Sequence, residues 1–282
     1  MNNFKEKFMQ YIFTMAACIS ILAVMLICIF LFAKGVPAIK EIGVFKFLLG
    51  TEWRPENDIY GIFPMIIGSI YVTAGALVIG VPIGILTAVF MARFCPKGIY
   101  KIINQGINLM AGIPSVVYGF FGLVVLVPFI RDNIGGRGLS VLTASVLLGI
   151  MILPTIVSVA ESSIRAVPDS YYEGALALGA SHERSVFKAV VPAASSGVLA
   201  GVILGMGRAI GETMAVMMVA GNQALIPESL LDGVRTLTTN IVMEMGYSTG
   251  LHREALIATA VVLFCFVLII NLSFSIVKRR TK

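Results

Sequence analysis

Long apolar runs separated by shorter polar segments make up most of this chain. Six runs reach the length of about 20 residues that an α-helix needs to cross the hydrocarbon core of a bilayer. They cover residues 8–33, 65–92, 107–130, 139–160, 193–221 and 255–277. The pattern predicts an all-α, polytopic membrane protein with six transmembrane helices.

The composition agrees with a membrane protein and excludes a water-soluble one. Hydrophobic residues make up 58% of the chain and charged residues 13%, whereas soluble globular proteins carry roughly 25% charged residues. Lys5 and Lys7 precede the first run as in a secretory signal. That run is longer than the roughly 7 to 15 apolar residues of a signal peptide, and no A-x-A-like cleavage site follows it. We therefore expect a retained first helix.

Lys and Arg are unevenly distributed among the segments that connect the runs. With six spans both termini share a side, and that side holds 12 basic and five acidic residues, against eight basic and nine acidic residues on the other. Because cytoplasmic loops retain Lys and Arg, both termini are predicted to lie in the cytoplasm. The basic residues form no stripe with interleaved aromatic residues, so a nucleic-acid partner is not expected.

The cysteines and histidines indicate neither a disulfide framework nor a metal site. Cys18 and Cys28 would lie about 15 Å apart on one helix, which is beyond the reach of a disulfide bond. His182 and His252 are isolated and lack metal-ligand spacing. We expect no catalytic residues, no cofactor and no metal.

Two charged residues, Arg208 and Glu212, fall inside the fifth apolar run. Their i, i+4 spacing predicts that they share a helix face and pair directly. Charged residues at this depth are expensive and usually face a bundle interior or an aqueous path. One interpretation is a weak anion site on a conduction path, in which Glu212 keeps the attraction shallow enough for release. The other is a structural ion pair that fixes helix packing.

Small residues in two of the runs have separate interpretations. The fifth run carries glycines at four-residue intervals, which let two helix backbones approach closely: Gly197, Gly201 and Gly205. In the third run Gly112 and Pro114 free or expose backbone groups, which is tolerated beside neighbours or a water-filled cavity. Ser115 is then either a hydroxyl donor toward that path or part of a kink that only shapes packing.

The polar segment 161–192 is the longest connection on the predicted cytoplasmic side. Ser170 and Glu173 fit a capping box, which predicts a helix from about Tyr171. Gly179 is a natural helix stop because glycine accepts the left-handed conformation. Ser181 is a candidate cap for a second short helix that runs through Phe187 until Pro192 interrupts it or begins the fifth span. The segment therefore predicts a helix, a glycine bend and a second helix projecting from the membrane.

The sequence EGALALGASHERSVFKAVVP within this segment resembles the coupling loop, or EAA loop, of ABC importer permeases. Glu173, Ala175, Gly179 and Pro192 occupy matching positions. Three positions depart mildly from the pattern: Gly174, Ala189 and Val191. The resemblance implies the type I ABC importer permease (MetI-like) fold, with the loop docking onto a separate ATPase subunit. The chain has no Gly-Lys dipeptide, and a Walker A loop requires one.

Three further stretches resemble the permeases of phosphate importers: GIPSVVYGFFGL (112–123), LPTIVSVAESSIRAVP (153–168) and GRAIGETMAVMMVAGN (207–222). The last is more similar to the C-type subunit (PstC) than to the A-type (PstA). The resemblance covers roughly residues 60–280. It implies an N-terminal transmembrane helix with an extracellular loop at 1–64, and a permease core of five transmembrane helices at 65–280 that includes the coupling loop.

The same resemblance implies the partners and the mechanism. They are a second, PstA-like permease, PstB-like ATPase subunits, a PstS-like external phosphate-binding protein and the lipid of a prokaryotic cytoplasmic membrane. The binding protein would deliver phosphate to an outer face made by loops 34–64, 131–138 and 222–254. ATP-driven closure of the ATPase subunits would then switch the side to which the cavity opens.

Three alternatives share part of this pattern. A secondary transporter or ion channel would explain the spans and the charged residues but leaves the coupling-loop spacing unexplained. A permease for another oxyanion, such as molybdate or sulfate, would share the loop and differ along the path. An intramembrane enzyme has the least support, because the sequence shows neither a nucleophile with a base nor paired catalytic carboxylates at useful spacing.

Overall fold

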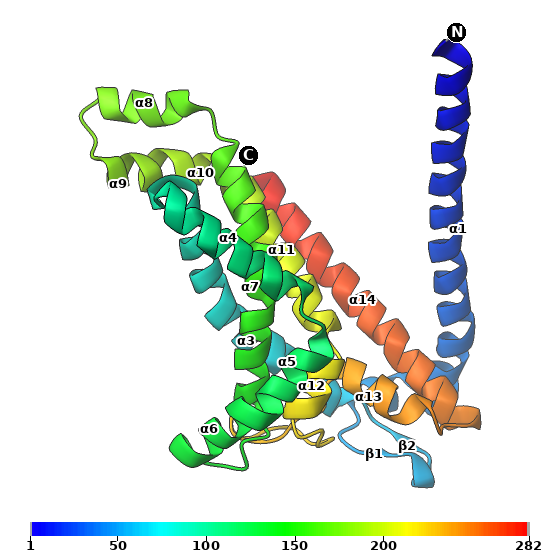
Figure 1. Cartoon of the computed structure of the whole chain (residues 1–282). Coiled ribbons are helices and arrows are strands. Elements are labelled where there is room, and N and C mark those ends of the chain that lie inside the picture. Colours follow the sequence, from blue (N-terminus) through cyan, green and yellow to red (C-terminus); the bar gives the residue numbers. More distant parts are fainter. Residues whose placement is uncertain (1, 281–282) are drawn as a thin grey trace.

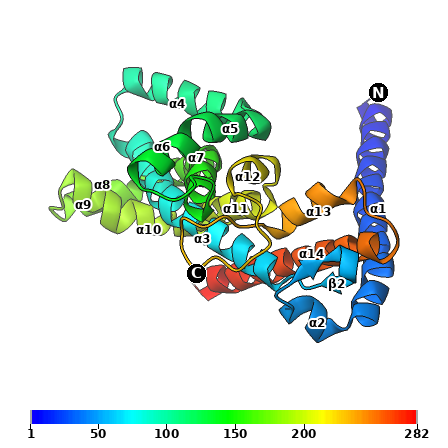
Figure 2. The same ribbon diagram turned by 90° about the horizontal axis from the view of Figure 1, so that it is seen from below.

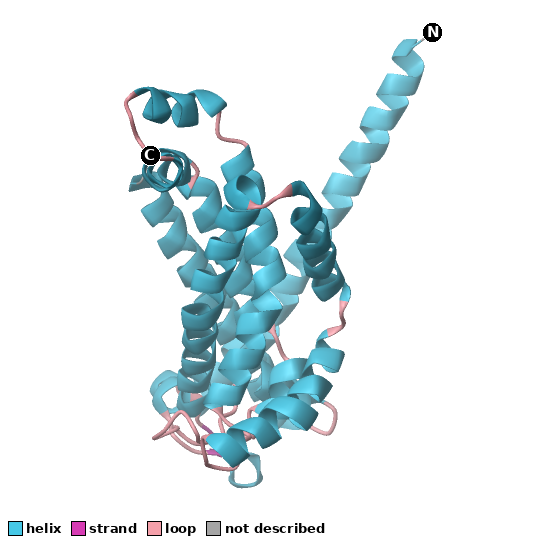
Figure 3. Cartoon of the chain, turned by 60° about the vertical axis from the view of Figure 1, so that its left-hand side comes forward, coloured by secondary structure: helices cyan, strands magenta, loops and turns pink. Residues whose placement is uncertain are grey.

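The computed structural model describes residues 2–280, with side chains described for residues 6–273. Lys282 and the side chains of Lys5, Lys278, Arg279 and Arg280, which the charge count uses, lie outside the described residues. Figure 3 shows that helices form nearly all of the molecule. The two short strands, β1 (Trp53–Arg54) and β2 (Ile59–Tyr60), pair antiparallel as a small hairpin.

Five helical segments within the described residues are long and apolar enough to cross a membrane. They are Glu6–Ile42, Phe63–Phe94, Ser115–Asn133, Val141–Arg165 and Gly250–Ser273. A sixth span arises if the pair His182–Ala193 and Ser195–Gly211, bent by 69°, is one crossing. Each predicted apolar run thus overlaps one of these segments, and the bounds agree best for the second and fourth runs, Phe63–Phe94 and Val141–Arg165.

The third apolar run is not one helix, which corrects the prediction for residues 107–130. Its first part belongs to α4 (Lys97–Gly112), and a new helix, α5 (Ser115–Phe121), begins after a break. Ile113 and Pro114 have extended backbones, with ψ of 127° and 144°. The residue before a proline is forced out of the helical conformation, so the break is local in origin. The chain continues through a π-helical turn, Gly122–Leu126, into α6 (Val127–Asn133).

The fifth run is also broken. The segment α9 (His182–Ser185) leads through a π-helical turn, Val186–Val190, and α10 (Val191–Ala193) to α11 (Ser195–Gly211). Glu212 has an extended backbone with ψ of 129°, and the short helix α12 (Met214–Val219) follows. The helix therefore ends between Arg208 and Glu212.

The core forms where α3 (Phe63–Val89) and α11 both pack on α7 (Val141–Arg165). In the most apolar window of α7, 67% of the residues are buried, against 33% for Phe63–Phe94. A Cβ at Gly205 would lie 2.8 Å from Ile156 Cγ1, and one at Gly201 would lie 3.2 Å from the Ile156 oxygen. The glycines of α11 thus allow close approach to α7, and their interpretation as packing residues is confirmed.

The first helix, α1 (Asn2–Ile42), stands apart from this core in Figures 1 and 2. None of the residues in its most apolar window is buried within the chain. Its last turns pack on α14 (Gly250–Arg280), where the Phe32 and Phe264 rings lie 6.0 Å apart. Between α1 and the core lie α2 (Val44–Leu49), the β1–β2 hairpin and α13 (Leu237–Met245).

The molecule has two ends of different make-up (Figure 1). The start of α1, the end of α14 and the segment from α8 (Asp169–Ala177) to α10 lie at one end. The β1–β2 hairpin, α6 and α13 lie at the other. The loops 34–64, 131–138 and 222–254 are thus gathered opposite the segment 161–192, as the alternation of spans requires. Which end faces the cytoplasm stays a prediction.

Candidate functional site

The segment from α8 to α10 projects from one end as a helix, a bend and a second helix. Gly179 has φ of +81°, and the Ser181 hydroxyl accepts the Arg184 backbone N–H at 3.3 Å. Both features confirm the predicted bend and the predicted start of α9. The predicted capping box is wrong: α8 begins at Asp169, with Pro168 as its N-cap and no side-chain cap hydrogen bond. Ser170 lies inside the first turn.

The residues predicted to contact an ATPase lie on the outside of this segment. Four of them are exposed, Glu173, Gly174, Gly179 and Pro192, and Ala175 is partly exposed. Two large apolar side chains beside them are also exposed: Leu178 by 91% and Tyr171 by 54%. Apolar side chains held away from a core in this way are typical of contact surfaces.

Arg208 lies in the last turn of α11 and is partly buried. Its Nη1 donates to Thr155 Oγ1 of α7 at 3.5 Å, the limit of a hydrogen bond. Within the part of the chain that the structure describes, this is its one hydrogen bond, and neither Nε nor Nη2 is buried. A guanidinium has five N–H donors, so most of those on Arg208 remain available.

Glu212 does not pair with Arg208, which corrects the predicted ion pair. One carboxylate oxygen, Oε1, accepts the backbone N–H groups of Thr213 and Ala215, each at 3.2 Å. Among the described residues no ion pair joins it to Arg208. The i, i+4 argument fails because α11 ends at Gly211, so the two residues are not on one helix. The carboxylate instead satisfies free N–H groups at the start of α12.

Two residues of α5 lie near the break at Pro114. Tyr118 is buried, and its hydroxyl donates to the Met110 carbonyl at 2.9 Å. Ser115 begins α5 and is partly exposed. It precedes Tyr118 by three residues and therefore shares its side of the helix. A role of Ser115 in the substrate path stays a prediction.

A polar face on α7 was not predicted from the sequence. Thr155, Ser158 and Ser162 follow each other at spacings of three and four residues, so they share one face. Ser158 and Ser162 are exposed within the chain, and Thr155 contacts Arg208. The available signal was the helical spacing of hydroxyl residues inside an apolar run.

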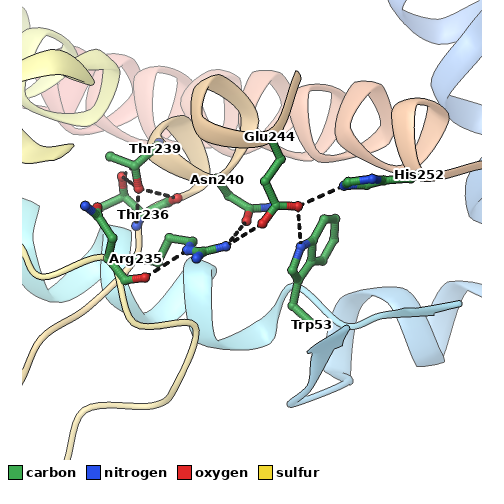
Figure 4. A network of polar contacts seen from close by, with 8 residues as sticks. Trp53, Arg235, Thr236, Thr239, Asn240, Glu244 and His252 are labelled. Carbon is green, nitrogen blue, oxygen red and sulfur yellow. Dashed lines mark hydrogen bonds and ion pairs between the residues drawn. The ribbon is translucent and has the colours of Figure 1, made fainter. Parts of the chain in front are cut away.

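At the hairpin end, a network of polar side chains surrounds Glu244 (Figure 4). Its Oε1 accepts Arg235 Nη1 at 2.7 Å, and its Oε2 accepts Trp53 Nε1 at 2.8 Å and lies 2.8 Å from His252 Nε2. The Glu244 side chain is only 9% exposed. Arg235 also donates to Asn240 Oδ1 and to the Asn222 carbonyl, both at 3.1 Å. Both oxygens of the buried Glu244 carboxylate therefore have polar partners.

The start of α13 joins this network to the break after α11. Thr236 caps α13 by a reciprocal pair of hydrogen bonds with Thr239, visible in Figure 4. Next to it, Thr238 Oγ1 donates to the Glu212 carbonyl at 3.1 Å. The extended residue that ends α11 is thus held by α13.

A hollow of about 550 Å³ borders the same network. Its lining includes Glu56, Asp58, Tyr60 and Glu244 but no Lys or Arg. Burial, and next to it the Asp58 carboxylate, raise the pKa of Tyr60 to about 12, so its hydroxyl stays protonated at neutral pH. Because carboxylates repel anions, this hollow does not suit an anionic ligand.

Comparison with known sequences places the chain among transport proteins. Residues 80–282 match the family model described as "Binding-protein-dependent transport system inner membrane component". The chain is 42% identical over 273 residues to a "Probable ABC transporter permease protein YqgH" of Bacillus subtilis, covering 93% of this chain and 88% of that protein. It is 33% identical over 279 residues to a "Phosphate transport system permease protein PstC" of Mesorhizobium japonicum, covering 91% and 85%.

Solved structures of low sequence identity share the fold. A bacterial alginate ABC transporter chain, solved in complex with an alginate-bound periplasmic protein, aligns with a TM-score of 0.65 at 15% identity, covering 94% of each chain. A chain of the MetNI methionine ABC transporter in an inward-facing conformation aligns with a TM-score of 0.59 at 20% identity. That alignment covers 79% of this chain and 94% of the other. These likenesses confirm the predicted MetI-like permease fold.

Proposed function

Since the chain belongs to the family of binding-protein-dependent transport system inner membrane components and is a permease subunit of an ABC importer, we propose that its substrate is inorganic phosphate. Relatives named as phosphate permeases, at 33% and 34% identity over most of the chain, support this choice. The 42% identical relative is named as a probable ABC transporter permease, without a substrate.

The observation that carries the proposal is the state of Arg208. A guanidinium in a membrane-spanning segment is costly and is usually partnered or functional. Arg208 has one long hydrogen bond, to Thr155, and its predicted partner Glu212 is engaged by the start of α12. Its charge and most of its N–H groups are therefore available to an oxyanion, which guanidinium binds well.

Along α7, hydroxyl groups would continue the path from this arginine. Thr155, Ser158 and Ser162 lead along one face of the helix toward the end that carries α8. Hydroxyl groups carry no net charge, so they would donate hydrogen bonds to an anion without the added attraction of a full positive charge that would trap it. Ser115, at the start of α5, would serve as a further donor near the break at Pro114.

We propose that α8 to α10 are the coupling loop and lie in the cytoplasm. Glu173, Gly174, Ala175, Gly179 and Pro192 would contact a groove of a separate, PstB-like ATPase subunit. The exposed Leu178 and Tyr171 supply apolar area for such a contact. The chain itself carries no Walker A sequence. ATP hydrolysis on another chain would then drive alternating access.

The other partners would occupy the rest of the molecule. A second, PstA-like permease would complete the path beside Arg208, and an external PstS-like phosphate-binding protein would dock on the hairpin end. This end gathers the β1–β2 hairpin, α6 and α13 (Figure 1). The whole assembly would lie in the cytoplasmic membrane of a prokaryote.

The test is uptake of labelled phosphate by proteoliposomes that hold the complete importer, with its binding protein outside and ATP inside. We expect uptake that depends on ATP and on the binding protein, and that excess unlabelled phosphate suppresses. Competition by molybdate or sulfate at equal or lower concentration would favour the other oxyanions instead. Uptake without ATP would contradict the importer mechanism itself.

A further inference from the structure

The linker between α7 and α8 is short and non-helical. It consists of Ala166, Val167 and Pro168. If α8 moves when a partner moves, a free three-residue linker would absorb the displacement rather than pass it on. The contacts around this linker therefore decide whether a displacement of α8 is transmitted to α7.

Arg93 holds the linker from both sides. It belongs to the π-helical turn Phe90–Phe94 that extends α3. Its Nη2 donates to the carbonyls of Ile164 in α7 and Val167 in the linker, at 3.3 and 3.5 Å. Its Nη1 lies 3.2 Å from Asp169 Oδ1, in the first turn of α8. One guanidinium thus contacts the helix before the linker, the linker itself and the helix after it.

Arg165, the last residue of α7, makes the reverse connection. Its Nη2 donates to the Met91 carbonyl in the same π-helical turn at 2.9 Å. Its Nε pairs with Glu161 at 2.7 Å, and its guanidinium carbon lies 4.7 Å from the centre of the Tyr100 ring of α4. Arg93, in the turn that extends α3, thus contacts the end of α7, and Arg165, at the end of α7, contacts that turn. We call Arg93 and Arg165 together the arginine joint.

The second half of the loop reaches the same place. His182 Nδ1 lies 2.8 Å from the Tyr172 hydroxyl, which joins α9 to α8. The Phe94 ring packs edge-on against the His182 ring, with centroids 4.7 Å apart. Both helices of the loop thus rest on the residues that surround Arg93.

Stability alone does not account for this arrangement. The Arg93 side chain is only 16% exposed, and its Nε is buried without a partner. Its acidic partner Asp169 is 76% exposed, and ion pairs to exposed carboxylates contribute little. A buried, incompletely satisfied guanidinium is a costly way to join two helices. It does, however, provide several donors in one rigid plane.

We propose that Arg93 and Arg165 are positioning residues that make α3, α7 and α8 move as one body, so that a displacement of α8 reaches the transmembrane helices. The inference rests on the proposed contact between the loop and an ATPase. Thr155, which contacts Arg208, lies on the same helix as Arg165. The joint would therefore link ATP hydrolysis to the proposed substrate path.

The test measures phosphate uptake and ATP hydrolysis in the same proteoliposomes with the complete importer. For Arg93→Gln and Arg165→Gln we expect hydrolysis to persist while phosphate transported per ATP falls about fivefold or more, the usual size of coupling between sites. Arg93→Lys keeps the charge but not the planar set of donors, and should restore only part of the ratio. Lys97→Gln, an exposed charge loss at the same end, should leave the ratio unchanged.

Several outcomes would overturn the inference. One is an assembled Arg93→Gln importer with the wild-type ratio, and another is a fall of uptake and hydrolysis in equal proportion. If Arg93→Gln does not assemble, Asp169→Ala decides, because it removes both the charge and the acceptor of the exposed α8 partner. An unchanged ratio in this variant counts against the joint. Failure of the proposed function is distinguishable, since the wild-type importer would then show no ATP-dependent phosphate uptake.

Discussion

The side chains of Arg235 and Arg208 are both partly buried, yet their surroundings differ. Arg235 donates to the Asn222 carbonyl, Asn240 and Glu244, and Glu244 is further held by Trp53 and His252 (Figure 4). Arg208 reaches one hydroxyl at 3.5 Å. Arg235 thus has a carboxylate partner and two further acceptors, whereas Arg208 has no charged partner among the described residues and keeps most of its donors free.

Under the proposed function, this difference separates a structural charge, Arg235, from a substrate-binding one, Arg208. A buried network with satisfied charges fixes its elements relative to each other and is costly to break. An arginine with free donors contributes little to the fold but can bind a passing anion. We propose that the partners of a charged side chain, rather than its place in the sequence, distinguish these roles.

The largest expected effect is on the closed network. Glu244→Ala leaves Arg235 without its carboxylate, and unpaired buried charges destabilise proteins by about 3 kcal/mol or more. We expect a clear loss of thermal stability of the purified complex in detergent, measured by the unfolding midpoint. Glu228→Ala, which removes an exposed carboxylate at the same end, is the control and should change little. A Glu244→Ala protein as stable as wild type would refute the structural role.

The open arginine should behave in the opposite way. Arg208→Ala should reduce phosphate uptake on the order of 100-fold, because it removes the charge and donors that attract the anion, while stability and assembly with partner subunits persist. Arg208→Lys should retain part of the uptake, since it keeps the charge but not the fork of donors. Normal transport by well-assembled Arg208→Ala would remove Arg208 from the path.

A smaller effect should follow from Trp53→Phe. The substitution keeps an aromatic ring but removes the indole N–H that reaches Glu244, and loss of a hydrogen bond to a charged group costs about 1.5 to 3 kcal/mol. The expected result is a partial loss of thermal stability, less than that of Glu244→Ala, with uptake by the assembled importer preserved. Equal stability of Trp53→Phe and wild type would mean that water replaces the indole.

The smallest expected effect sharpens the description of the path. Thr155→Val removes the hydroxyl beside Arg208 and should lower uptake by a few-fold, because the lost hydrogen bond is long, at 3.5 Å, and contributes only about 1 kcal/mol. Thr155→Ser retains the hydroxyl and should be close to wild type. If the two variants transport equally well, the polar face of α7 has no part in transport.

Local patterns predicted the elements whose causes are local. The spans followed from the lengths of apolar runs, and the bend of the projecting loop followed from Gly179 and Ser181. Local patterns gave wrong predictions where a second local feature, such as a proline, opposed the apolar run or the capping box. Pro114 and Glu212 interrupt runs that hydropathy reads as continuous, and Pro168 starts α8 before the Ser170 box can form.

By itself, therefore, the sequence determined that this is a membrane-spanning permease with a projecting loop, and it identified Arg208 as an unusual charge. Only the tertiary structure decided what surrounds each charge. Trp53 and Glu244, hydrogen-bonded across 191 positions of the chain, and Arg93 and Asp169, 76 positions apart, carry no joint signal in the sequence. Hydrogen bonds form between groups that folding brings together, and the spacing of residues along a chain encodes neighbours only within one helix or turn.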